Sequence, residues 1–283
     1  MINACIGLEF RNGSDLYVLT NHEDGEYTES RIFSYNVETG DISPYFIFEN
    51  WIKRFRILGD KKVYASQWDD ALYMTSETED EEHHFTIKCI TAFDILDSGD
   101  VVLVGLDGKA ARLTKEGKPS TIQTGLTGDI LNCKAVGSEV YFCGAKGLFG
   151  KIQDLKKATK IELGTNRFLT ALETNSDMSK LLVSGRGILL EIEDGELKEI
   201  ARDIDFYEST EIEGVWYVTA GTDGLFRVVR DELERVSAIP GYCIAKTDGA
   251  IAIGGLDAFT ILRDGVETTI KLDRNVLEKI HVY

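Results

Sequence analysis

Two pairs of closely spaced aspartates are the side chains in this sequence best suited to chemistry. Asp69 and Asp70 are adjacent, and Asp203 and Asp205 are separated by one residue, so either pair could act as acid and base or bind a calcium ion. Exposed carboxylates at strand ends explain both pairs more simply. We therefore keep an enzyme that uses carboxylates with a divalent metal, such as a lactonase, hydrolase or lyase, as the alternative hypothesis.

The other residues that could bind a metal or a cofactor are poorly placed for that role. His83 and His84 are adjacent, so on a strand they would point to opposite faces and could not chelate one ion. The glycines of residues 144–150 (GAKGLFG) lead into a second strand-like run and not into a helix that could hold phosphate. We expect no catalytic residues, no metal site and no cofactor.

Acidic side chains dominate the composition. The net charge is −17, from 48 acidic and 31 basic residues, and such a field repels nucleic acid and anionic membranes while it attracts basic partners. Residues 69–82 hold seven acids and no base, and residues 191–213 hold ten acids and two bases. Solvated loops and strand edges explain either segment alone, but together the two segments indicate an acidic docking face. Its predicted members are Glu77, Glu79, Asp80, Glu81, Glu82, Asp203, Asp205, Glu211 and Glu213.

Cysteine usage and the apolar runs bear on the compartment. The sequence has no run of about 18 apolar residues and no N-terminal signal-peptide pattern, so we expect a cytoplasmic protein. The five cysteines lie in apolar, strand-like runs, which indicates reduced and buried thiols. Cys133 and Cys143 could face each other across a hairpin, which leaves one disulfide open.

A repeated sequence unit determines where the acidic and cysteine residues described above lie in the fold. Residues 101–125 and residues 140–164 share one order: an apolar strand, a Gly-x-x-Gly turn, another strand, a charged turn and a last strand. A further strand precedes each, so the unit is a four-stranded antiparallel meander of roughly forty residues. The turn between its second and third strands recurs at intervals of 34 to 45 residues, ending at Gly25, Asp70, Gly108, Gly147, Gly187, Gly224 and Ala258.

Four-stranded units with this period indicate a β-propeller. Residues 35–40 (YNVETG) match the tyrosine and Thr-Gly turn common between outer strands of blades, and the chain resembles the broad seven-bladed superfamily of the WD-repeat, kelch and YVTN type. We expect a single all-β domain over residues 1–283, a seven-bladed β-propeller of four-stranded antiparallel blades. A double β-sandwich is the structural alternative. Residues 275–283 (NVLEKIHVY) have the pattern of an innermost strand, which either takes the inner position of the first blade or adds a strand.

The rim of such a propeller is the predicted binding surface. Turns between second and third strands and linkers between blades gather on one face, around a central channel. Aromatic and arginine side chains on this rim would form hot spots for protein binding. The predicted partner-binding residues are Trp51, Trp68, Asp69, Asp107, Lys146, Arg167, Arg186, Asp223, Tyr242 and Asp257.

The acidic segments have predicted positions as well. The loop at residues 77–82 joins a third and a fourth strand, so it should lie on the opposite face. Residues 203–213 should form an inner strand with Asp203, Asp205, Glu211 and Glu213 on one side, lining an acidic channel. The first hypothesis is therefore a non-enzymatic propeller that binds a basic protein, for example as an immunity-type inhibitor of a toxin or nuclease, or as a scaffold.

Overall fold

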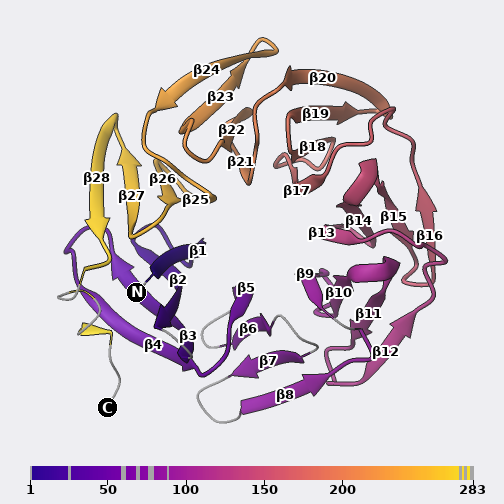
Figure 1. The fold of residues 1–283 in the computed structure, drawn as a ribbon, viewed down its shortest axis with the longest axis horizontal. Coiled ribbons are helices and arrows are strands. Elements are labelled where there is room, and N and C mark those ends of the chain that lie inside the picture. The colour runs from indigo at the N-terminus through magenta and orange to yellow at the C-terminus, as the bar shows by residue number, and fades with distance from the viewer. Residues whose placement is uncertain are drawn as a thin grey trace.

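The fold is a ring of β-sheets. The computed structural model describes residues 2–24, 27–58, 62–67, 71–75, 80–87, 89–273, 276, 279 and 280. In this part of the chain, seven four-stranded sheets stand around a central axis like the blades of a propeller (Figure 1). Each sheet takes four consecutive strands, the first at the centre of the ring and the fourth outside. The predicted all-β propeller of four-stranded antiparallel blades is confirmed.

The strands follow one another around the ring without crossing between sheets. The first four sheets contain β1 (Ile2–Phe10), β2 (Asp15–Asp24), β3 (Tyr27–Asn36) and β4 (Ile42–Phe48); β5 (Ile52–Leu58), β6 (Lys62–Gln67), β7 (Ala71–Thr75) and β8 (Asp80–His84); β9 (Ile90–Ile95), β10 (Val101–Gly105), β11 (Ala110–Leu113) and β12 (Pro119–Ile122); β13 (Ile130–Val136), β14 (Glu139–Gly144), β15 (Phe149–Gln153) and β16 (Lys157–Lys160). The other three contain β17 (Leu169–Thr174), β18 (Lys180–Gly185), β19 (Ile188–Glu193) and β20 (Glu196–Arg202); β21 (Ser209–Ile212), β22 (Val215–Thr219), β23 (Leu225–Val229) and β24 (Glu232–Ser237); β25 (Cys243–Thr247), β26 (Ala250–Gly254), β27 (Ala258–Arg263) and β28 (Val266–Lys271).

Burial falls from the middle of each blade to its outer edge. Strand β10 (VVLVG) is buried at every position because neighbouring blades cover both of its faces, which is why its sequence is a continuous apolar run. Strands β20 and β28 form outer edges and are mostly exposed, with charged residues along them. The amino-acid composition of a strand therefore indicates its position within the blade: apolar strands lie in the middle and charged strands at the outer edge.

The recurrent turn glycines lie where one blade meets the linker to the next. Gly147 has a φ of +70°, and a side chain there would collide with the carbonyl oxygen of Thr165. Its N–H donates to the carbonyl of Arg167 at 2.7 Å. The turn therefore rests directly on the backbone that enters β17. This contact, as well as the backbone conformation, explains why glycine recurs at this position.

Within the described residues, the ring closes without strand exchange. The Cys5 N–H donates to the Gly255 carbonyl at 3.1 Å, and Ala4 and Leu256 form an isolated β-bridge. The prediction of a C-terminal strand is wrong for the described residues: Val276 and Lys279 are helical, and the Ile280 N–H bonds to the Val276 carbonyl at 3.3 Å. Both adjoining sheets already hold four strands of their own.

The C-terminal segment still has a part in closure, through apolar packing. Ile280 and Leu272 are almost fully buried, and they belong to the apolar cluster that joins the first sheet to the last. Phe259 lies in the same cluster, with its ring centroid 5.3 Å from that of Tyr35. Hydrophobic burial therefore stabilises the junction between the first and the last sheet. In a propeller closed by strand exchange, hydrogen bonds within one sheet would have this role.

The prediction of reduced thiols is confirmed, and four of the five cysteines are buried as expected, with Cys89 partly exposed. Cys133 pairs in register with Phe142, and Cys143 with Asn132, so the two cysteines point to opposite faces of their sheet and the hairpin disulfide that was left open does not form. Cys5 and Cys243 instead meet across the ring closure, with their sulfur atoms 4.0 Å apart. All five cysteines are free thiols.

The inner strand predicted at residues 203–213 is much shorter. Asp203 has a φ of +68°, and its N–H donates to Gly187, while the Phe206 N–H donates to Gly185. These bonds tie the segment to the preceding blade as a linker, so strand β21 begins only at Ser209. Asp203 and Asp205 are exposed on the rim and do not line the channel.

Candidate functional site

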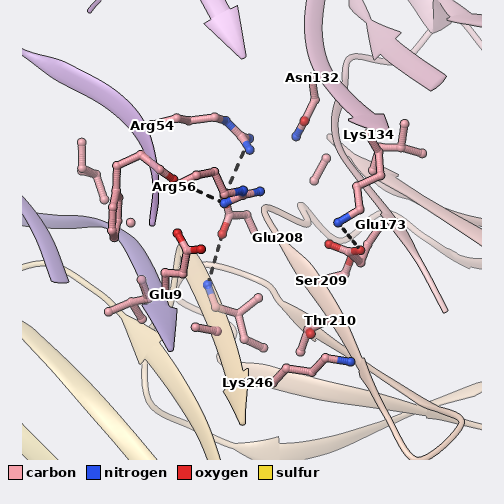
Figure 2. A pocket seen from close by; sticks show the side chains of 18 of the residues that line it. Glu9, Arg54, Arg56, Asn132, Lys134, Glu173, Glu208, Ser209, Thr210 and Lys246 are labelled. Atoms are coloured by element: carbon pink, nitrogen blue, oxygen red, sulfur yellow. Dashed lines mark hydrogen bonds and ion pairs between the residues drawn. The ribbon is translucent and has the colours of Figure 1, made fainter. Parts of the chain in front are cut away.

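The central channel contains a polar cavity of about 250 Å³. Residues from six inner strands or their immediate ends line it, and Figure 2 shows charged side chains converging on it from around the ring. The basic residues of the lining are Arg54, Arg56, Lys134 and Lys246, and the acidic ones are Glu9, Glu173 and Glu208. A concentration of basic side chains is notable in a chain of net charge −17.

Five inner strands contribute one charged residue each at an equivalent position. In each of these strands, the pairing with the second strand of the blade skips one residue near the start of the strand. The charged residue lies two positions after the residue at which the pairing resumes. In ring order these residues are Glu9, Arg56, Asp94, Lys134 and Glu173, so the sign of the charge alternates from blade to blade. We call them the charge ring. Adjacent blades are thus attracted to each other at the channel wall.

Contacts within the charge ring differ in length. Lys134 Nζ lies 2.7 Å from Glu173 Oε1, a direct salt bridge (Figure 2). Arg56 Nε is 3.9 Å from Asp94 Oδ1, which is beyond hydrogen-bond distance. Asp94 Oδ2 instead accepts the Ala135 N–H at 2.8 Å. The carboxylate therefore satisfies the backbone of the next blade and leaves Arg56 only loosely paired.

Glu9 bonds to the next blade in the same manner. The Ile57 N–H donates to Glu9 Oε2 at 3.1 Å. Burial raises the pKa of Glu9 to about 7, and the nearby Arg56 and this hydrogen bond offset only part of the effect. Glu9 therefore titrates near neutral pH.

A second layer of charge lies beside the charge ring. Arg54 Nη2 is 3.7 Å from Glu208 Oε1, and Glu208 Oε2 accepts the Ile244 N–H at 3.2 Å (Figure 2). Burial raises the pKa of Glu208, although Arg54 opposes the shift. The arginine is again left with a long ion pair because its carboxylate partner already serves a backbone donor.

The rim carries exposed apolar side chains. Trp51, which was predicted here, is 49% exposed in the linker before β5. It borders a mainly apolar cavity of about 400 Å³, which Ile6, Asn21, Ile52 and Lys53 also line. Burial lowers the pKa of Lys53 to about 8, and the charge of Arg54 adds to this effect. Trp68 and Asp69 lie outside the described residues.

The other predicted rim residues lie on the face expected from the topology. Asp107, Lys146, Asp223 and Asp257 are exposed in turns between second and third strands, and Arg186 is exposed beside them. The Arg167 guanidinium lies 3.2 Å from Asp203. Tyr242 stacks edge-on against Tyr207, with ring centroids 4.9 Å apart.

Three exposed apolar residues on this face were missed. Leu256 is 61% exposed in the β26–β27 turn, Phe168 is 45% exposed before β17, and Tyr207 is 38% exposed before β21. The Arg186 guanidinium lies 5.6 Å from the Phe168 ring centroid, a cation–π contact. Tyr207 was missed because the predicted inner strand at residues 203–213 includes it, whereas the strand begins only at Ser209. We define the apolar rim as Trp51, Phe168, Tyr207, Tyr242 and Leu256.

The predicted acidic surface is divided among several places. Glu77 and Glu79 lie outside the described residues, whereas Asp80, Glu81 and Glu82 belong to the outer strand β8 and not to a loop. There the Tyr73 hydroxyl donates to Glu82 at 2.7 Å, and Glu81 contacts His83 at 2.8 Å.

Glu211 and Glu213 also depart from the prediction. Glu211 is buried, accepts hydrogen bonds from the Ser176 hydroxyl and the Gly214 N–H, and contacts Lys246. Glu213 is exposed in the β21–β22 turn on the opposite face. Neither lines the channel, so the predicted acidic channel wall is wrong. The charge ring, with Glu208, stands in its place.

The described residues contain no group of three or more His, Cys, Asp or Glu side chains arranged to hold a metal ion. They also contain no helix that is long and apolar enough to cross a membrane.

Comparison with known proteins informs the fold alone. No family model matches the chain, and no curated protein matches it. Among solved structures, the computationally designed Ika8 protein is similar, with a TM-score of 0.67 and 12% sequence identity over 95% of this chain and 86% of that one. At this identity the likeness supports the propeller architecture and carries no function.

Proposed function

We propose that this chain is a non-enzymatic binding protein, which engages a basic protein partner through its apolar rim. The observation that carries the proposal is that Trp51, Phe168, Tyr207 and Leu256 are all exposed on one face, where Tyr207 also packs against half-buried Tyr242. Aromatic residues dominate protein-binding hot spots, and a set of exposed apolar side chains on one face is the surface such a partner would cover.

Charge supports the choice of a basic partner. In the described turns and linkers, exposed aspartates share the face with the apolar rim: Asp107, Asp203, Asp205, Asp223 and Asp257. Basic residues of the same turns and linkers include Lys109, Lys146, Arg167 and Arg186. Complementary charge around an apolar centre speeds association and excludes wrong partners. An immunity-type inhibitor of a toxin or nuclease, acting in the cytoplasm, is the specific form that we favour.

The blade organisation also supports a kinship proposal. The four-stranded repeat and the YVTN-like turn at residues 35–40 favour a place among the seven-bladed WD-repeat, kelch and YVTN propellers. Propellers with the same architecture have many unrelated functions, so this kinship does not indicate which partner the chain binds.

A pull-down with matched variants tests the proposal. Wild-type protein, Leu256→Ser and Trp51→Ala are immobilised beside Val266→Ser, which removes a 63% exposed apolar residue from outer strand β28. We expect one stoichiometric basic protein, released by salt, that binds the wild type and Val266→Ser but is lost from the two rim variants. Equal capture by all four proteins would contradict the proposal, as would capture of an acidic protein.

A further inference from the structure

We propose that the central channel binds a small organic monocarboxylate, and that Arg54 and Arg56 hold its carboxylate group. Both arginines come from β5 and face the same cavity, with one residue between them (Figure 2). This site goes beyond the proposed function, because it lies inside the ring and not on the rim.

The first argument is the incomplete pairing of these two arginines. Their contacts to Glu208 and Asp94 are 3.7 and 3.9 Å long, whereas Lys134 lies 2.7 Å from Glu173. A guanidinium has five N–H donors in a planar fork that matches the two oxygens of a carboxylate. Neither arginine has a bidentate carboxylate partner among the described residues.

The second argument is that the protein's own carboxylates are committed elsewhere. Glu9, Asp94 and Glu208 each accept a backbone N–H from the inner strand of the following blade. Turning them toward the arginines would leave buried N–H groups without a partner, which is costly. An incoming carboxylate can complete the guanidinium hydrogen bonds without that penalty.

The third argument is the shape and polarity of the cavity. The charge ring ends at β17. On the last two inner strands Thr210 and Ala245 line the cavity together with Lys246, and Glu208 lines it directly before β21. Thr210 and Ala245 are smaller than the charge-ring residues, so the body of a ligand has room beside them. A volume of about 250 Å³ limits that ligand to a small molecule.

Charge balance favours a single negative charge over several. The lining holds four basic and three acidic side chains, and Asp94 stands behind Arg56. A monocarboxylate held by the two arginines brings one negative charge close to Glu9 and Glu208, whereas a multiply charged phosphate would bring more charge to the same acids and be repelled more strongly. A neutral or amino-bearing body suits the remaining lining.

The test measures binding to the full chain with lactate, 4-aminobutyrate and inorganic phosphate as probes, by ligand-observed NMR and calorimetry. The variants are Arg56→Gln, Arg54→Lys and the control Arg263→Gln, whose arginine is exposed at the end of β27. Arg54→Lys keeps the charge and removes the fork, so it remains informative if a charge-deleting variant fails to fold.

We expect at least one monocarboxylate to bind the wild type and Arg263→Gln, with affinity lowered about tenfold or more in Arg56→Gln and Arg54→Lys. Rim variant Leu256→Ser should bind the probe as the wild type does. Failure of both monocarboxylates at millimolar concentration, tighter binding of phosphate, or equal affinity in all variants would overturn the proposal.

Discussion

Replacing Glu9 with glutamine should change how stability depends on pH. Burial raises the pKa of this carboxyl group from 4.5 to about 7 in the folded chain. Between these two values the folded protein holds a proton that the unfolded chain has released. The free energy of unfolding of the wild type therefore falls as pH rises through this window, and this contribution levels off above pH 7.

The size of the effect follows from the shift. Each pKa unit corresponds to about 1.4 kcal/mol, so ionised Glu9 costs the folded state about 3 kcal/mol at alkaline pH. Glutamine stays neutral and keeps an oxygen that can accept the Ile57 N–H. Relative to the wild type, Glu9→Gln should gain about 2.5 kcal/mol in unfolding free energy between pH 5 and pH 8.

Urea denaturation followed by tryptophan fluorescence at several pH values measures this difference. Glu267→Gln, on exposed strand β28, controls for the loss of one negative charge from a highly acidic protein. The reasoning is refuted if the stability gap between Glu9→Gln and the wild type is the same at pH 5 and pH 8. It is also refuted if Glu267→Gln shows an equal gain, because the cause would then be net charge and not burial.

Three more outcomes are expected. Ile280→Ala should lower the free energy of unfolding by about 2 to 4 kcal/mol, measured with urea, because it opens a cavity at the ring closure. Diamide should oxidise Cys5 and Cys243 to a disulfide that peptide mapping detects, and the reaction should speed up with pH, because the hydrogen bond between the two thiols and burial raise the pKa of Cys243. Calcium, magnesium, manganese and zinc should leave the melting temperature unchanged, and a rise with any of them would favour the metal-dependent enzyme.

Local pattern was enough to predict most of the fold. The further strand predicted before residues 140–164 is β13, and the turns ending at Gly108 and Gly147 lie between second and third strands as expected. Two-residue alternation and turn glycines are properties of short segments, so the sequence displays them directly. What it displays less clearly is where a linker ends and a strand begins.

The errors came from contacts between blades. Residues 203–208 alternate like a strand, but the N–H groups of Asp203 and Phe206 bond to the preceding blade, and that partner is not visible in the segment itself. The C-terminal segment likewise looked like a strand, while Val276 and Ile280 lie in a helical turn and pack on the ring closure. Tertiary bonding overrode local preference in both cases.

The charge ring could also be found in the sequence, but only if the inner strands are aligned at the residue that each of them skips in its pairing. Its members are 38 to 47 residues apart, so no window of the sequence shows the alternation. Listing the inner strands is not enough, because a slip of one residue moves every side chain to the other face. The register near the start of each inner strand is therefore the information that a sequence analysis of such repeats must recover.

The placement of charge suggests that the two proposed sites will respond differently to salt. The channel lining is nearly balanced in sign and partly buried, while the excess of acid lies on the outer surface. Salt screens exposed charges far more than buried ones. A basic protein held at the rim should therefore dissociate as salt rises, whereas a monocarboxylate bound by Arg54 and Arg56 should lose little affinity over the same range. The acidic outer surface thus attracts a partner over a long distance, whereas the channel site binds its ligand through short polar contacts.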